Sequence, residues 1–196
     1  MKKIYAILFV GALLFSCKKN DVMDRTIFIP DEDNYRLPAY TEWGYNSFGA
    51  EYEREYFLAE SHIVPCKVLY NGNNKKMQFS LHGTTYSCYN TVLVFTFPFE
   101  QMLEYKDLEQ LNNVKINLAD KNCMVKMIRD TVETTLDVLD GELYFKRAQL
   151  LSIDDKENRV ILSGTFEVLF LQKGFPMSFS NGRFDVGITK NVFYAN

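Results

Sequence analysis

Apolar and polar positions alternate over much of the chain, and the pattern is clearest near its C-terminal end. In the run VILSGTFEVLF at residues 160–170, the even positions are mostly apolar, whereas Ser163, Thr165 and Glu167 lie between them. This alternation predicts a β-strand with one buried face. Gly164 interrupts the pattern and indicates a bulge or a close approach of another backbone segment.

Similar strand-like stretches recur at short intervals from Trp43 onward. Turn-forming residues separate several of them, notably Asn71-Gly72-Asn73-Asn74, Asp154–Asn158 and Asn181-Gly182. The predicted strands cover residues 48–59, 61–70, 77–84, 91–99, 114–118, 123–129, 141–153, 160–170 and 177–188. The stretch TVLVFTFPF at residues 91–99 is apolar on both faces, which is typical of a strand covered on two sides.

Only residues 100–112 show a helical pattern, with Met102, Leu103, Leu108 and Leu111 among acidic residues. Strands and helices do not alternate, so a parallel sheet with crossover helices is excluded. We therefore predict an all-β fold, an antiparallel β-sandwich or flattened barrel of about nine or ten strands with one short helix.

The N-terminus, MKKIYAILFVGALLFSC, has the organisation of a secretory signal. Lys2 and Lys3 precede an apolar run of about a dozen residues, which is shorter than the roughly 20 that a membrane-spanning helix needs. Residues Leu14 to Cys17 resemble a bacterial lipobox, in which the cysteine becomes the acylated first residue. An ordinary signal peptide that contains a chance cysteine is the alternative.

These features divide the chain into three parts. Residues 1–16 are the predicted signal peptide, residues 17–40 the lipidated Cys17 with a flexible tether, and residues 41–196 a single β domain. Acyl chains such as palmitate on Cys17 would anchor the protein to the membrane. Lys18 and Lys19 follow the cysteine, where no acidic residue favours inner-membrane retention, so we expect the outer membrane, with either a periplasmic or a cell-surface face.

Charge excludes one class of partner. The chain has 22 Lys and Arg, two of them in the first 16 residues, so the remaining 20 against 25 Asp and Glu give residues 17–196 a formal charge of −5. This balance argues against nucleic acid, which requires a basic surface. It also argues against a purely electrostatic attachment to anionic lipid.

No constellation of catalytic or metal-binding residues stands out. Cys66, Cys88 and Cys123 remain beside Cys17, and they contain no CxxC pair, so we expect no metal and no cofactor. An oxidising compartment permits a Cys66–Cys88 disulfide, and buried free cysteines are the alternative. His62 and His82 are the only histidines, and we expect each to be satisfied locally rather than to form a site.

Two short polar motifs admit specific interpretations. Asp130-Thr131-Val132 resembles the acceptor used for periplasmic O-glycosylation in Bacteroidetes, with Thr131 as the modified residue and an ordinary polar turn as the alternative. Arg183 and Asp185 point to the same side of a strand, away from Phe184, and predict a surface salt bridge across strands.

The stretch TEWGYNSFGA at residues 41–50 lies where the tether meets the first strand. Gly44 and Gly49 permit a tight turn, and Asn46 and Ser47 can bond to their own backbone. We therefore expect a structural role, in which Phe48, with Trp43, covers one end of the core. The alternative is an exposed Trp43 that touches a ligand.

This stretch, TEWGYNSFG at residues 41–49, resembles the opening motif T-x-x-G-x-N-T-F-G of small uncharacterised Bacteroidetes lipoproteins. The runs SGTFE at 163–167 and NGRFDV at 181–186 are similar to the S-G-T-F and G-x-F-D motifs that close the same domains. The resemblance implies a lipid-anchored β domain of unknown function and transfers no catalytic residue. The run YEREYF at 52–57 departs from the family's Asn-Gly turn and tryptophan.

We therefore expect an outer-membrane lipoprotein whose non-catalytic β domain binds a ligand, a protein or a glycan. A deep apolar cavity would favour a small hydrophobic ligand, and a filled core with an exposed aromatic patch would favour a protein or glycan partner. The alternatives are a glycan-processing hydrolase with two facing carboxylates and a structural or adhesion component of the cell envelope.

Overall fold

A computed structural model of the protein describes residues 25–60, 65–85, 90–100, 104–153 and 156–196, and shows the predicted all-β fold. The helical element is a short 3₁₀-helix, η2 (Tyr105–Leu111). The strands are β1 (Ser47–Tyr52), β2 (Glu55–Ala59), β3 (Cys66–Asn71), β4 (Lys76–Thr84), β5 (Asn90–Pro98), β6 (Val114–Asn117), β7 (Met124–Arg129), β8 (Val132–Thr135), β9 (Asp137–Ile153), β10 (Lys156–Gln172), β11 (Phe175–Ile188) and β12 (Phe193–Ala195).

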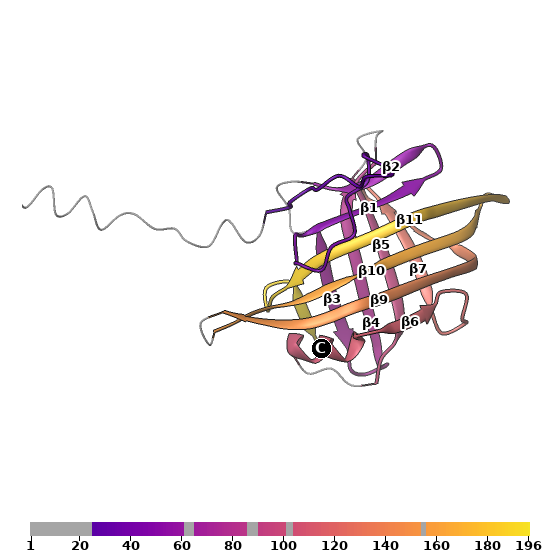
Figure 1. Ribbon diagram of the computed structural model, residues 1–196. Helices are drawn as coiled ribbons and strands as arrows, with labels where there is room; N and C mark the ends of the chain where they lie inside the picture. Colours follow the sequence, from indigo (N-terminus) through magenta and orange to yellow (C-terminus); the bar gives the residue numbers. More distant parts are fainter. Residues whose placement is uncertain (1–24, 61–64, 86–89, 101–103, 154–155) are drawn as a thin grey trace, which may run out of the picture.

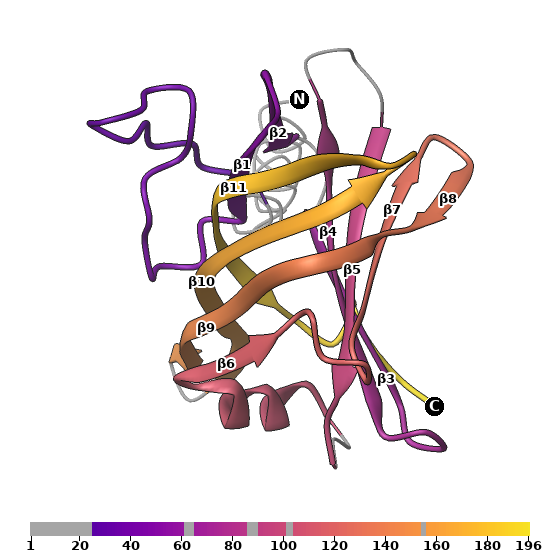
Figure 2. The ribbon, with the colours of Figure 1, turned by 90° about the vertical axis from the view of Figure 1, so that its right-hand side faces the viewer.

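The strands form one curled sheet with the order β6-β9-β10-β11-β1-β2-β4-β5-β7-β8, a half-barrel in which these ten strands pair antiparallel. Strand β3 also pairs with β4, and β12 lies parallel to β3. Figure 1 shows the long strands β9, β10 and β11 crossing in front of β3, β4, β5 and β7. The side view in Figure 2 shows that the two halves of the curled sheet enclose the interior between them.

Aromatic side chains fill this interior. Phe79 is fully buried, and its ring lies 6.3, 5.3 and 5.1 Å from the rings of Phe95, Phe145 and Phe184, which come from both halves of the sheet. Aromatic pairs at these distances add to the hydrophobic stabilisation from burial. The interior is therefore a packed core of side chains, with phenylalanines at its centre.

The predicted turn at Asn71–Asn74 is confirmed as the β3–β4 hairpin, where Lys75 takes a φ of 51°. The predicted single strand at residues 48–59 is wrong, because the chain reverses after Tyr52 and forms the β1–β2 hairpin. Glu53 makes that reversal with a φ of 55°, a left-handed conformation for which the sequence offers neither Gly nor Asn. The short strands β8 and β12 were also missed.

Helix η2 begins at a capping box, in which the backbone N–H of Glu104 donates to Asp107. Its Leu108 and Leu111 are buried against the core. Helix η2 and Asn112, which follows it, also cover the edge of β9 where β6 no longer pairs with it. The backbone N–H of Ala148 donates to the Asn112 side chain, and that of Leu150 to Glu109, at 3.1 and 2.9 Å. The segment therefore satisfies edge groups that would otherwise be free to pair with another chain.

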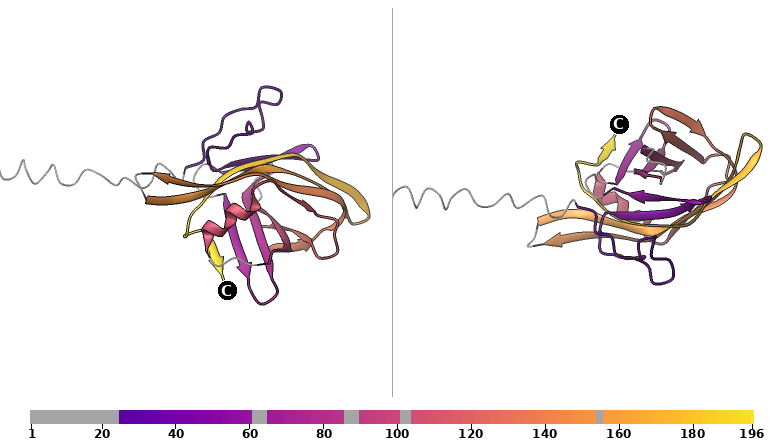
Figure 3. Two further views of the ribbon diagram at one scale, coloured as in Figure 1. Left: turned by 60° about the horizontal axis from the view of Figure 1, so that its bottom comes forward. Right: turned by 90° about the horizontal axis from the view of Figure 1, so that it is seen from above.

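Residues 25–46, called here the N-terminal strap, lie on the outer face of the sheet beside β1 and β11 (Figure 3). Leu37 and Pro38 of the strap are buried, and a Cβ atom at Gly49 of β1 would lie 2.4 Å from Pro38 Cδ. Glycine is therefore required where the strap crosses β1. Part of the predicted tether thus packs against the sheet. Among the described residues, no helix has the length and apolar character needed to cross a membrane.

Candidate functional site

Asp185 joins the strap to the sheet. Its carboxylate is 2 % exposed and accepts hydrogen bonds from five donors. Three are consecutive backbone N–H groups, those of Trp43, Gly44 and Tyr45, at 3.1, 2.7 and 3.2 Å. The others are the hydroxyls of Thr41 and Ser163. Gly44, with a φ of 72°, turns the backbone so that these N–H groups converge on one carboxylate.

A second hydrogen bond joins the end of the strap to β11. The side-chain oxygen of Asn46 accepts a hydrogen bond from the backbone N–H of Gly187 at 2.9 Å. The sequence segments 41–49, 163–167 and 181–186 therefore meet in space, through Thr41, Gly44, Asn46, Ser163 and Asp185 among others. Their common task in this protein is to fasten the strap, and the expectation of a structural role for residues 41–50 is met in that respect.

The surface salt bridge across strands that Arg183 and Asp185 predicted is wrong. Both side chains point away from Phe184, as the alternation predicts, but the strap covers this face of β11. Asp185 is buried under residues 41–45, and Arg183 pairs instead with Asp31 of the strap. The backbone N–H of Asn34 and the Arg183 guanidinium lower the pKa of Asp31.

Trp43 does not cover the core. Phe48 is buried as predicted, but the Trp43 side chain is 72 % exposed. Its backbone N–H is held by Asp185 while its ring faces outward. The position is therefore structural through its backbone and leaves an exposed indole on the surface.

Two of the β-bulges in the long strands lie near Gly164 and near Asn181. The β9–β10 register shifts between the pairs Arg147–Ser163 and Phe145–Gly164, so Lys146 has no partner in β10. In β11, Asn181 takes a φ of 52° where the register with β10 shifts. The bulge or close approach predicted at Gly164 is confirmed, since a Cβ there would lie 2.0 Å from the carbonyl oxygen of Tyr144. Bulges of this kind turn side chains out of the regular alternation.

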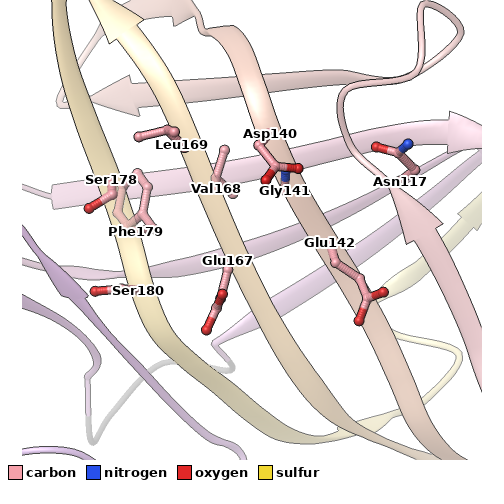
Figure 4. Close-up of a pocket in the computed structure, with 10 residues that line it drawn as sticks. All are labelled: Asn117, Asp140, Gly141, Glu142, Glu167, Val168, Leu169, Ser178, Phe179 and Ser180. Atoms are coloured by element: carbon pink, nitrogen blue, oxygen red, sulfur yellow. The ribbon is translucent and has the colours of Figure 1, made fainter.

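The bulges border a groove on the outer face of β6, β9, β10 and β11. It consists of two adjoining pockets of about 450 and 440 Å³ that share Glu142 and Glu167. Figure 4 shows the first pocket, where polar side chains from β6, β9 and β11 lie around the two glutamates. We call this surface the outer-face groove.

Tyr40 of the strap and Lys146 of the β9 bulge border the second pocket. The Lys146 ammonium lies 4.7 Å from the centre of the Tyr40 ring and 6.0 Å from that of Tyr144. In the described part of the chain, no carboxylate lies within ion-pair distance of Lys146. Partial burial and a hydrogen bond to Glu42 raise the pKa of Tyr40, so its hydroxyl stays protonated. The groove thus combines an aromatic ring, an unneutralised cation and carboxylates.

Glu142 and Glu167 stand opposite one another on β9 and β10, and their side chains extend the same way in Figure 4. Directly opposed residues have Cβ atoms about 4.5–5.5 Å apart, and like charges there are destabilising. Lys115 offsets part of this repulsion, because its ammonium lies 3.1 and 3.3 Å from the two Glu142 oxygens. The pair is open to solvent, since the Glu142 side chain is 49 % exposed.

His82 is satisfied locally, as expected. Its Nε2 lies 3.0 Å from Ser80 Oγ, and that hydroxyl donates its only hydrogen to the Lys67 carbonyl. His82 Nε2 must therefore be the donor toward Ser80. Burial, followed by the charge of Lys67, lowers the pKa of His82. His62 lies outside the described residues.

The remaining predicted sites stay predictions. Cys17 and Cys88 lie outside the described residues, so neither the lipidation nor the Cys66–Cys88 bridge is tested. Cys66 is buried in β3 and Cys123 is half-buried. Thr131 is exposed in the turn between β7 and β8, where Asp130 takes a φ of 51°, so a glycan would meet no steric obstacle there. Within the described ranges, no group of three or more His, Cys, Asp or Glu could hold a metal ion.

Sequence reasoning missed the outer-face groove. The predicted turn at Asp154–Asn158 did not indicate the glutamate pair, because its central residue, Lys156, is 14 residues from Glu142 and 11 residues from Glu167. The observed register of β9 and β10 is what places the two glutamates opposite one another. Comparison of the chain with family models, curated proteins and solved structures gave no match.

Proposed function

We propose that the chain is an outer-membrane lipoprotein whose non-catalytic β domain binds a glycan or protein partner in the outer-face groove. The observation that carries this proposal is the convergence of Tyr40, Lys146, Glu142 and Glu167 on one open surface, beside bulges that turn side chains toward it. Aromatic rings flanked by charged and amide groups suit polyhydroxylated ligands and the polar rims of protein partners.

The filled core supports a partner that binds outside the half-barrel. Phenylalanines from both halves of the sheet occupy the interior, so a small hydrophobic ligand would have to displace packed side chains. The groove, in contrast, is open and polar. Of the two kinds of ligand expected from the sequence, a glycan or protein is therefore favoured.

The anchor rests on the lipobox at Cys17 and is supported by the surface that follows it. Ile27, Phe28 and Ile29 of the strap are each more than 40 % exposed, and Trp43 is also exposed. The hydrogen bond from the Ile27 N–H to the Tyr45 carbonyl places these residues close to Trp43. Exposed aliphatic and aromatic residues close to an acylated cysteine suit the membrane interface. Mass spectrometry of the native protein should show acyl chains on Cys17, and Cys17→Ala should release the protein from the membrane.

Binding is tested with a glycan array and a pull-down from the native host, both with the anchored protein. Tyr40→Ala and Lys146→Ala should each weaken capture of the same partner about tenfold, because each removes a direct contact. Arg147→Ala is the matched control, since Arg147 is the exposed neighbour of Lys146 and does not line the groove. Equal loss in the control, or no captured glycan or protein at all, would refute the groove as the binding site.

A glycan-processing hydrolase is the second candidate, favoured by the facing Glu142–Glu167 pair. Retaining glycosidases place two carboxyl groups about 5–5.5 Å apart, and the opposed register allows this distance. Against it, the groove does not supply the burial that usually prepares a catalytic acid, and Lys115 holds both oxygens of Glu142. Release of reducing sugar that disappears in both Glu142→Gln and Glu167→Gln would establish the enzyme and refute the non-catalytic proposal.

A further inference from the structure

A separate pocket of about 640 Å³ lies between the strap, the β1–β2 hairpin and the end of β4. None of the residues that line it belongs to the outer-face groove. The volume is in the range of small-molecule sites, about 300–1,000 Å³. The pocket therefore has room for a ligand of its own.

The sheet topology explains why space remains at this position. Strand β2 pairs with β4 through only two residue pairs, Leu58–Thr84 and Ala59–Gly83, and the rest of β2 pairs with β1 alone. The first half of β2 therefore diverges from β4. The strap crosses the same region and completes the wall with Tyr35 and Arg36.

Two arginines, Arg36 and Arg54, line the pocket. The Arg36 guanidinium lies 5.8 Å from the centre of the Tyr35 ring and 5.6 Å from that of Tyr56. Over the described ranges, neither Arg36 nor Arg54 has an acidic group within 4.0 Å. Two flanking rings restrict where the guanidinium can lie, and its N–H groups remain available for a planar, bidentate acceptor.

Thr85, at the end of β4, supplies a second and independent indication of a ligand. The residue is 3 % exposed and lines the pocket, yet its hydroxyl has no hydrogen-bond partner among the described residues. Buried hydroxyls in native proteins are nearly always hydrogen-bonded, because an unpaired one destabilises the fold. A ligand atom that accepts from Thr85 would remove this penalty.

The charge of the lining indicates which anion fits. Arg36 and Arg54 against Glu55 leave one net positive charge, in a chain whose formal charge is −3. One positive charge matches a carboxylate better than a phosphate, which carries close to two negative charges at neutral pH. The ring of Tyr35, which is 72 % exposed, offers a face on which the body of the ligand can stack.

We propose that this pocket binds a carboxylate-bearing small molecule. Arg36 and Arg54 hold the carboxylate, the tyrosine rings contact the body of the ligand, and the Thr85 hydroxyl donates to a second acceptor atom. The proposal requires neither the lipid anchor nor binding in the outer-face groove.

Calorimetric titration of the full-length protein tests it with two cyclic carboxylates, glucuronate and benzoate, and their uncharged counterparts, glucose and benzamide. At least one carboxylate should bind saturably and at least about tenfold more tightly than its counterpart, with an affinity that falls as salt is added. Arg36→Gln and Arg54→Gln should each weaken that binding about tenfold, whereas Arg147→Gln, outside the pocket, should not. Failure of both carboxylates to bind, equal binding of charged and uncharged members, or tighter binding of inorganic phosphate would overturn the proposal.

Thr85→Val separates a ligand contact from a structural role. Valine keeps the shape and removes the unpaired hydroxyl, so the free protein should melt at the same or a higher temperature. The same variant should bind the carboxylate several-fold more weakly. Unchanged affinity would show that the hydroxyl does not face the ligand and would refute that part of the site.

Discussion

Asp185 provides the sharpest test of how the strap is held. In Asp185→Ala, five donors lose their acceptor at once. The hydrogen bonds from Ser163 and Gly44 are buried, so these two donors cannot turn to water, whereas those from Thr41, Trp43 and Tyr45 are only partly buried. Each buried donor left unpaired costs about 1–3 kcal/mol. We therefore expect a loss of about 2–6 kcal/mol in the free energy of unfolding.

Urea unfolding followed by far-ultraviolet circular dichroism measures this loss. For a domain of this size, about 2–4 °C in Tm corresponds to each kcal/mol, so Tm should fall by roughly 4 to 24 °C. Glu167→Ala is the matched control, because it removes an exposed carboxylate from the neighbouring strand and should change stability by less than about 0.5 kcal/mol.

A double-mutant cycle isolates one bond of the set. Ser163→Ala removes a single donor, and its coupling to Asp185→Ala should be about 1.5–3 kcal/mol, the range for a hydrogen bond to a charged group. Hydrogen exchange at the Gly44 amide should accelerate in Asp185→Ala. A coupling below about 0.5 kcal/mol, or a Tm within 2 °C of wild type, would refute the view that the buried carboxylate fastens the strap.

Three further outcomes follow from the geometry. Trp43→Ala should leave Tm within about 2 °C of wild type, since the ring is exposed and only the backbone N–H is used; a large loss would restore the original core-covering interpretation. Gly164→Ala should cost at least about 2 kcal/mol in urea unfolding, because its Cβ meets the Tyr144 carbonyl, and normal stability would contradict the close approach. The lowered pKa of His82 means that the unfolded chain binds its proton more readily. Stability should therefore decline as pH falls from above about 6.5 through the lower folded-state pKa, and His82→Asn should flatten that part of the urea-stability profile; an unchanged slope would contradict the assignment.

Local patterns predicted the parts of the fold that local forces decide. Alternation located β10, and the Asn and Gly residues at 71–74 located the β3–β4 turn. The apolar run at residues 91–99 located β5, but Val92 and Val94 on its second face are only half-buried, so the expected cover on both faces is incomplete. The sequence did not predict the β1–β2 reversal, because Glu53 adopts its left-handed backbone under tertiary constraint rather than by intrinsic preference. Such a turn leaves no mark in the composition of the segment.

The surface was harder to predict than the core for a similar reason. Side-chain alternation placed Asp185 on the correct face of β11, but whether that face meets water depends on a segment more than 140 positions earlier. The same strap brings Tyr40 to the outer-face groove and Arg36 to the separate pocket between the strap, the β1–β2 hairpin and β4. Both candidate sites therefore arise from one non-local packing event, which single-sequence patterns do not encode.

The sequence separation between the strap and Asp185 also sets how long this contact must wait during synthesis of the chain. Thr41 and Asp185 are 144 positions apart, and β1 pairs on one side with β11. At a synthesis rate of about 5–20 residues per second, roughly 7 to 30 seconds separate the appearance of the two halves of this contact. During that interval β1 lacks β11 as a neighbour, and the strap lacks the carboxylate that holds it. The strap can therefore take its place on the sheet only after almost the whole chain has been made.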